Sequence, residues 1–281
     1  MQVDAHQHFW RLADREGQWP PPSLQAIHRD FGPQDLAPLL EAAGIDATVL
    51  VQSMPSLADT HWMLSVAAAT PWVRGVVGWA DFKAADADAQ IDALARDPLL
   101  KGLRPMLQDL PDDDWIADPA CDPAAAAMQR HGLVFDALVL PRQLRGLRRF
   151  AERHPGLRIV IDHAAKPFIA RGEMEPWRTD IAALATLPHV HCKLSGLLTE
   201  AGDRRDAAAL HPYAQALWEL FGPQRLLWGS DWPVLRLAAD YADWWQLCHT
   251  LAHDFKPAPQ PDDLHALFGG NAARLYHLAP C

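Results

Sequence analysis

Two histidines, His6 and His8, lie two residues apart at the end of an apolar segment close to the N-terminus. Successive side chains of a β-strand point to opposite faces, so residues two apart point the same way. A strand here would place two imidazoles side by side, and each offers a nitrogen that can bind a metal or hydrogen-bond a substrate oxygen. Taken alone, the pair is equally compatible with a surface position without function. An expression-tag remnant is disfavoured because the flanking residues are apolar.

A carboxylate, Asp231, follows another short apolar segment near the other end of the chain. Such a carboxylate can accept a proton from a bound water and so act as a general base. The alternative role for Asp231 is to cap the segment that follows it. His163, which follows Asp162, is in turn either a third imidazole of the same site or a structural histidine bonded to Asp162 or to backbone.

The elements that must position these groups alternate along the chain. Short apolar runs predict strands at Gln2–His8, Ala47–Gln52, Val73–Ala80, Leu99–Leu107, Leu133–Ala137, Arg158–His163, Val190–Leu194 and Arg225–Ser230. Longer Ala/Leu-rich stretches predict helices at Leu36–Ala43, Asp59–Ala69, Ala85–Ala95, Pro123–Arg130, Pro141–His154, Trp177–Leu187, Ala208–Phe221, Tyr241–Ala252 and Asp262–Leu278. This alternation predicts an α/β fold, a single-domain (β/α)8 TIM barrel over residues 1–281. A doubly wound open sheet is the second architecture, and it is disfavoured because no Gly-rich phosphate loop follows the first strand.

Active sites of such barrels lie at the carboxyl ends of the strands. Polar and aromatic residues near those ends are predicted to bind substrate: Gln52, Arg104, Gln108, Lys166, Lys193, Trp10, Trp79 and Trp232. Strand alternation leaves open whether Lys193 and Asp136 point into the barrel or outward.

Charge and composition favour a small-molecule ligand. The formal net charge is −10 and no basic run is present, which argues against nucleic-acid binding. No segment is apolar for long enough to span a membrane, and no signal peptide is apparent. Four scattered cysteines, Cys121, Cys192, Cys248 and Cys281, are typical of reduced thiols, so the cytoplasm is the predicted location. A homo-oligomer is compatible with the sequence.

Five segments carry a resemblance to the amidohydrolase superfamily, and within it to the sugar-lactonase branch. They are Asp4–Trp10, Asp162–Pro167, Cys192–Leu197, Trp228–Pro233 and Gly269–Tyr276. The resemblance implies a barrel hydrolase that opens a lactone ring with water, and it implies His6, His8, His163 and Asp231 as the catalytic group.

The same resemblance leaves the metal content open. The fourth and fifth predicted strands lack the carboxylated lysine, glutamate or histidine that many amidohydrolases use, so a two-metal site is not expected. One divalent ion, with zinc as the natural candidate, would be held by His6, His8 and Asp231. Catalysis without a metal is the alternative, because an ester carbonyl is a better electrophile than an amide.

The predicted function is therefore hydrolysis of a sugar lactone to its open acid. A dicarboxylate lactone would require several arginines in the pocket, and only Arg104 is predicted at a strand end. A neutral polyhydroxylated lactone therefore fits better. A metal-dependent decarboxylase, or another amidohydrolase acting on a small carboxylated substrate, is the second hypothesis. A non-catalytic barrel that binds a sugar or a partner is the third.

Overall fold

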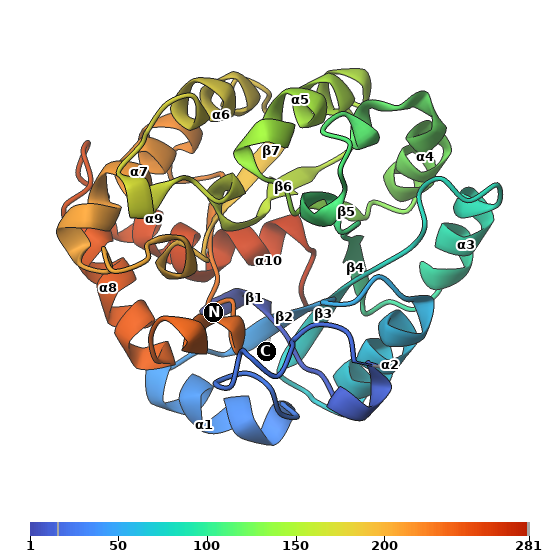
Figure 1. Ribbon diagram of the computed structural model, residues 1–281, viewed down its shortest axis with the longest axis horizontal. Helices are drawn as coiled ribbons and strands as arrows, with labels where there is room; N and C mark the ends of the chain where they lie inside the picture. The colour runs from blue at the N-terminus through green and yellow to red at the C-terminus, as the bar shows by residue number, and fades with distance from the viewer. Residues whose placement is uncertain (16, 280–281) are drawn as a thin grey trace.

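The computed structural model describes residues 1–15 and 17–279, and its centre is a barrel of parallel strands (Figure 1). The strands are β1 (Val3–Gln7), β2 (Ala47–Val51), β3 (Val73–Gly78), β4 (Leu100–Leu103), β5 (Val134–Ala137), β6 (Ile159–Ile161), β7 (Val190–Leu194) and β8 (Leu226–Trp228). They form one sheet of eight strands in chain order. Each strand matches a predicted one, so the predicted barrel is confirmed.

The barrel closes through the backbone next to the two strongest sequence signals. The amide of Asp231 donates to the carbonyl of His6 at 2.8 Å, and the amide of His8 donates to the carbonyl of Trp232 at 2.7 Å. The hydrogen bonds that join the first and last strands therefore also fix the separation of Asp231 from His6 and His8.

Helices α1 to α8 surround the barrel as an outer ring, and α10 lies inside that ring, across the barrel (Figure 1). The helices are α1 (Pro33–Ala43), α2 (Leu57–Ala68), α3 (Ala87–Leu94), α4 (Asp122–Arg130), α5 (Leu144–Arg153), α6 (Trp177–Ala185), α7 (Ala207–Phe221), α8 (Tyr241–His253), α9 (Pro261–His265) and α10 (Asn271–Leu275). Gly44, Gly132 and Gly222 follow α1, α4 and α7 with positive φ angles, a conformation that glycine adopts without a Cβ penalty.

The predicted helix Asp262–Leu278 is wrong as a single element. The structure divides it into α9, a π-helical turn (Ala266–Gly270) and α10. A Cβ at Gly269 would collide with the backbone of Met1, so the chain passes directly against the start of β1 at that glycine. The close approach interrupts the helix, and α10 then packs beside β1 and β8.

The apolar core has two parts. The larger cluster lies between the strands and the outer helices. A smaller cluster contains alternate strand residues such as Val49, Val77 and Val160, together with Leu275 and Tyr276 at the end of α10. Alternation places the second set toward the barrel axis, where side chains from the last helix complete it.

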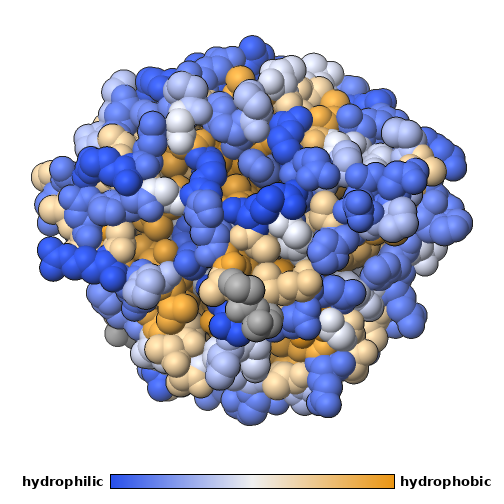
Figure 2. Space-filling view, turned by 180° about the vertical axis from the view of Figure 1, so that it is seen from behind, coloured by the Kyte–Doolittle hydropathy of each residue, from blue (hydrophilic) through white to orange (hydrophobic). Residues whose placement is uncertain are grey.

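The surface carries polar residues over most of the face seen from behind, with small hydrophobic areas between them (Figure 2). Among the described helices, none combines the length and hydropathy needed to cross a membrane. Cys121, Cys192 and Cys248 are buried free thiols, and Cys281 lies outside the described residues.

Candidate functional site

A cavity of about 500 Å³ opens at the carboxyl ends of the strands. Its walls come from the loops that follow the strands: His8, Trp19, Ser53, Arg104, Met106, Gln108, Asp109, Leu138, His163, Lys166, Thr199, Glu200, Asp231, Val234 and Leu237. The predicted catalytic residues His8, His163 and Asp231 line this cavity, and His6 lies directly beneath them, fully buried.

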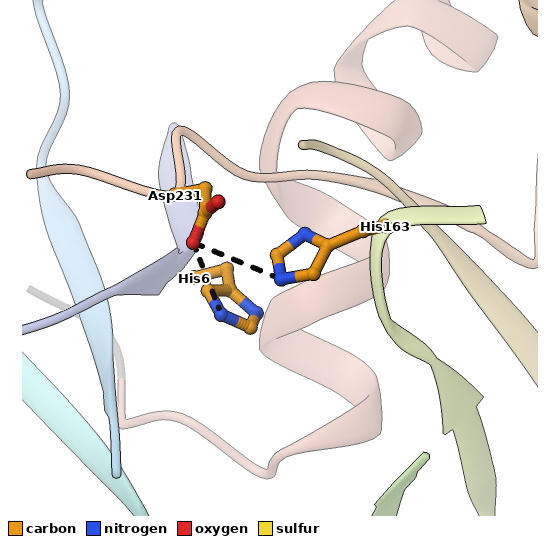
Figure 3. A group of neighbouring side chains, drawn as sticks. All are labelled: His6, His163 and Asp231. Atoms are coloured by element: carbon orange, nitrogen blue, oxygen red, sulfur yellow. Dashed lines mark ion pairs between the residues drawn. The ribbon is translucent and has the colours of Figure 1, made fainter. Parts of the chain in front are cut away.

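Asp231 is the centre of the cluster (Figure 3). One carboxylate oxygen, Oδ1, lies 3.2 Å from His8 Nε2 and 3.7 Å from the Nε2 atoms of both His6 and His163. Asp231 has a φ of 59°, a left-handed backbone conformation that is costly for a residue with a Cβ. The closing hydrogen bonds of the barrel hold the residue in this conformation, which directs the carboxylate at the three imidazoles.

Burial and charge set the protonation states of this cluster. Burial raises the pKa of Asp231, but the adjacent imidazoles outweigh it and hold that pKa well below its usual range. Burial also lowers the pKa of His6 and His8, and it lowers that of His163 to about 4. At neutral pH the site is therefore one carboxylate that faces neutral imidazoles.

His163 is held by an unusual backbone. Residues His163 to Lys166 all have φ between 52° and 57°, a left-handed turn, and His163 Nδ1 lies 2.9 Å from Ser195 Oγ. Gly196 packs against the ring, since a Cβ at that position would lie 2.6 Å from His163 Cγ and Nδ1. A glycine with a φ of 63° therefore allows the ring to reach the cavity.

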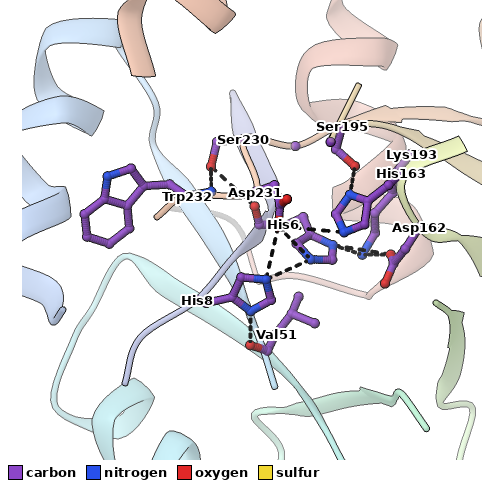
Figure 4. Close-up of polar contacts among 12 residues, drawn as sticks. His6, His8, Val51, Asp162, His163, Lys193, Ser195, Ser230, Asp231 and Trp232 are labelled. Carbon is purple, nitrogen blue, oxygen red and sulfur yellow. Dashed lines mark hydrogen bonds and ion pairs between the residues drawn. The ribbon is translucent and has the colours of Figure 1, made fainter. Parts of the chain in front are cut away.

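Buried charged side chains lie against the imidazoles inside the barrel. Figure 4 shows Lys193 and Asp162 next to His6, and Asp136 is fully buried with them. The Nζ atom of Lys193 lies 2.6 Å from Asp136 Oδ2, 3.0 Å from Asp162 Oδ1 and 3.1 Å from His6 Nδ1. Burial lowers the pKa of Lys193, but the two carboxylates outweigh it and raise the pKa above its ordinary value. Tyr276 donates its hydroxyl to Asp136 at 2.7 Å. Lys193, whose direction strand alternation leaves open, thus points into the barrel and is a cation.

The cluster has the donor set of a metal site. His6, His163 and Asp231 each offer a ligand atom, and these atoms lie within 4.8 Å of one another. Asp231 Oδ1 lies 3.2–3.7 Å from the imidazole nitrogens. Two nitrogen or oxygen ligands of a tetrahedral zinc ion lie about 3.3 Å apart, so these separations are compatible with a shared ion. The set predicted from the sequence, His6, His8 and Asp231, also lies close together, since His8 Nε2 is 3.2 Å from both His6 Nε2 and Asp231 Oδ1. His163 is a further imidazole that converges on the same carboxylate.

The residues predicted to bind substrate fall into two groups. Arg104, Gln108 and Lys166 line the cavity. The others lie outside its walls: Gln52, Lys193, Trp10, Trp79 and Trp232. Gln52 donates to the carbonyl of Arg104, and Lys193 lies below His6.

The tryptophans outside the cavity have packing partners instead. Trp10 and Trp232 both make edge contacts with Phe31. Trp79 is half-buried and its backbone amide donates to Thr60 Oγ1 at 2.8 Å.

Several cavity residues were not found from the sequence. Trp19, Asp109, Glu200, Val234 and Leu237 lie on the loops or short turns that follow strands, not at strand ends. Residues in such loops have no periodic pattern that predicts which way a side chain points. A search restricted to strand ends therefore misses them.

A closed parallel barrel with a His/Asp cluster at the carboxyl ends of its strands defines the (β/α)8 class of enzyme. The sequence profile of the amidohydrolase family matches residues 3–278, and the chain belongs to that family.

Relatives extend over almost the whole chain. It is 54% identical over 279 residues to an L-fucono-1,5-lactonase of Burkholderia ambifaria, which covers 98% of this chain and 95% of that protein. It is 37% identical to an L-fucono-1,5-lactonase of Burkholderia multivorans, over 99% of this chain and 96% of that protein. A crystal structure of an amidohydrolase from Burkholderia multivorans with bound zinc is 37% identical with a TM-score of 0.90, and covers 99% of this chain and 100% of that one.

The site predicts a histidine that resists protonation. In protein treated with chelator, NMR titration of the His163 ring should give a midpoint near pH 4, because burial disfavours the imidazolium. The Asp231→Asn variant should titrate lower still, since the Asp231 carboxylate favours the charged ring. A midpoint at the ordinary value for histidine in the native chain would contradict this description of the cluster.

Proposed function

We propose that this protein hydrolyses a sugar lactone, an aldonolactone, to the open-chain acid. The observation that carries the proposal is the Asp231 carboxylate at the cavity wall, in contact with three neutral imidazoles. The 54% identity to a lactonase named for L-fucono-1,5-lactone supports it and makes that lactone the first substrate to test.

The proposed reaction uses Asp231 as a general base. A water in the cavity adds to the lactone carbonyl carbon while the Asp231 carboxylate accepts one of its protons. The carbonyl π electrons move to oxygen, and Arg104, a cavity cation, stabilises the resulting oxyanion together with the imidazoles. The ring C–O bond then breaks. The proton returns to the ring oxygen directly from Asp231 or through His163, whose Nε2 lies 3.7 Å from Asp231 Oδ1.

The low pKa of Asp231 makes it a weak base in the resting state, which constrains the mechanism. The imidazoles that lower this pKa favour the ionised carboxylate, so it is available to accept a proton at any neutral pH. An ester carbonyl requires less activation of the water than an amide. We propose that the fixed position of the Asp231 carboxylate beside the substrate compensates for its low basicity, because its strained backbone holds it there.

The charges of the cavity suit a neutral, polyhydroxylated substrate. Its cations are Arg104 and Lys166, and both face carboxylates: Arg104 lies 3.1 Å from Asp162 and Lys166 lies 3.5 Å from Glu200. Asp109 adds a further acidic wall residue. Paired charges can hydrogen-bond sugar hydroxyls, whereas a substrate carboxylate would meet Asp109 and Glu200 as like charges. This disfavours the decarboxylase alternative.

We propose zinc as the ion that the site would accept, with His6, His163 and Asp231 as its ligands and His8 adjacent. When bound, such an ion supplies Lewis acidity for a carbonyl oxygen or a water. The same side chains are also the proposed proton acceptor and hydrogen-bonding groups.

We further propose a cytoplasmic setting, which suits the buried free thiols of Cys121, Cys192 and Cys248.

The Asp231→Asn variant tests the proposal. It should lose about 10²–10⁴-fold in kcat for L-fucono-1,5-lactone, because an amide cannot accept the proton of water. Acid release with a pH indicator measures the rate. Asp243→Asn, an exposed change on α8, is the matched control and should keep full activity. Full activity of Asp231→Asn would contradict the proposal. Native protein that binds the lactone but does not hydrolyse it would support the non-catalytic alternative.

A glycine pair tests the role of His163. Gly196→Ala should reduce kcat, because the added Cβ must displace the His163 ring from its place beside Asp231. Gly132→Ala is the matched control: it has the same φ of 63°, but its Cβ would lie 3.4 Å from Arg158, away from the cavity. Gly132→Ala should lose about 1 kcal/mol of stability in urea unfolding, since it replaces a glycine at positive φ. Gly196→Ala should lose more, because its Cβ also collides with the His163 ring. Equal activity of the two variants would count against a role for His163.

A further inference from the structure

One aromatic side chain on the cavity wall has no part in the proposed chemistry. Trp19, in the loop after β1, lines the cavity and is 37% exposed. Among the described residues, it is the one large hydrophobic residue that is exposed. An indole left open to water inside a ligand cavity gains free energy when a ligand covers it. The position of Trp19 therefore indicates a surface for the apolar part of a substrate.

A buried guanidinium holds the backbone of Trp19 in place. Arg15 is only 2% exposed, and its Nη1 donates to the carbonyl of Trp19 at 2.9 Å. Its Nη2 donates to Ser53 Oγ at 2.6 Å, and Ser53 is itself a wall residue of the cavity. A buried charge is costly unless such hydrogen bonds replace its lost water. Arg15 thus ties the loop that carries Trp19 to the loop after β2.

A row of aromatic rings connects Trp19 to the catalytic carboxylate. Edge-to-face contacts join Trp19 to Trp10 at 5.2 Å between centroids, Trp10 to Phe31 at 5.4 Å, and Phe31 to Trp232 at 5.2 Å. Trp232 directly follows Asp231, and its ring points away from the imidazoles (Figure 4). Edge-to-face pairs attract each other, so the row sets the place of Trp19 relative to Asp231. Two tryptophans predicted to bind substrate therefore support a third.

The two kinds of cavity wall match the two faces of a sugar ring. Arg104, Lys166, Asp109 and Glu200 can hydrogen-bond hydroxyl groups. Apart from the imidazoles, Trp19 is the aromatic residue among the described wall residues. In L-fucono-1,5-lactone the C4 hydroxyl is axial, so the hydrogens on C3, C4 and C5 share one face of the ring. This apolar face is the part of the lactone that a flat indole can cover.

We propose that the lactone ring stacks through its C–H face on the indole of Trp19, and that Arg15 is the positioning residue that holds the indole at the cavity. Trp19 then contributes binding and selectivity and does not act on the reacting carbonyl. The site selects lactones of the galacto configuration, in which that face is intact. The choice of substrate rests on the proposed lactonase function.

Substitutions at Trp19 separate stacking from simple bulk. Trp19→Leu should raise KM for L-fucono-1,5-lactone about 10–100-fold with kcat almost unchanged, because the stacking is equal in the ground and transition states. Trp19→Phe keeps a ring and should retain most of the affinity. Trp62→Leu is the matched control: Trp62 is a half-buried tryptophan on α2, outside the cavity walls, and its loss should leave KM unchanged. A native KM in folded Trp19→Leu would overturn the inference.

The same variant tests which face of the sugar is recognised. The C4 epimer, 6-deoxy-L-glucono-1,5-lactone, carries its C4 hydrogen on the opposite face of the ring. Native protein should favour L-fucono-1,5-lactone over this epimer in kcat/KM, and Trp19→Leu should reduce the preference about tenfold. An unchanged preference would contradict stacking through the C–H face.

Arg15→Lys tests the positioning role. Lysine keeps the charge, but its ammonium lacks the planar fork that reaches both Trp19 and Ser53. KM should rise about threefold to tenfold with kcat retained, and the same change should have little effect in Trp19→Leu, because Arg15 acts through Trp19. Circular dichroism checks that the variants are folded. Fully additive effects of the two substitutions would overturn the positioning role.

A ligand without a carbonyl distinguishes this inference from the proposed function. 1,5-Anhydro-L-fucitol has the same ring and nothing to hydrolyse. Its C3, C4 and C5 protons should shift upfield in NMR spectra on binding to native protein, because they lie over an aromatic ring, and these shifts should disappear with Trp19→Leu. If native protein hydrolyses no lactone, the proposed function fails, while the shifts still decide the role of Trp19. Native protein that causes no such shifts would overturn the inference.

Discussion

The ion pairs of Lys193 with Asp136 and Asp162, inside the barrel, are the constraint on which the rest of the site depends. Isolated charges in an apolar interior cost many kcal/mol, so each of these groups must be paired and hydrogen-bonded. The partners come from β5, the end of β6 and β7, with Arg104 after β4 and Tyr276 at the end of α10. Each of these elements must therefore present its polar side chain to the barrel axis at a fixed height.

That buried layer supports the reactive one above it. His6 lies on Lys193 and Asp162, and the other two imidazoles are oriented by Val51 and Ser195. The carboxylate of Asp231 is held from the opposite direction by backbone bonds that close the seam between β1 and β8. Rigid placement of both partners allows a carboxylate of low basicity to face neutral imidazoles in a fixed geometry. Stability and reactivity therefore depend on the same few contacts.

The sequence alone predicts the barrel and its cluster well, for physical reasons. Buried parallel strands are short and apolar, and the side-chain period of two places His6 and His8 side by side, with their Nε2 atoms 3.2 Å apart. The inward direction of Lys193 was not predictable, because strand alternation leaves the facing side undetermined until neighbours are known. Trp10 and Trp232 are aromatic residues near strand ends that pack on Phe31, and composition does not distinguish packing from stacking on a sugar. Loop residues such as Trp19 and Glu200 lack any periodicity that would place them in the cavity.

The central claim is that Asp231 activates water and does not itself attack the lactone. Single-turnover hydrolysis of L-fucono-1,5-lactone in H₂¹⁸O, with enzyme in excess and mass analysis of the product, tests it most directly. A general base predicts that the new carboxylate oxygen comes from labelled solvent in the first turnover. Unlabelled acid in that turnover, with ¹⁸O found in Asp231, would show that the carboxylate is a nucleophile and would contradict the account.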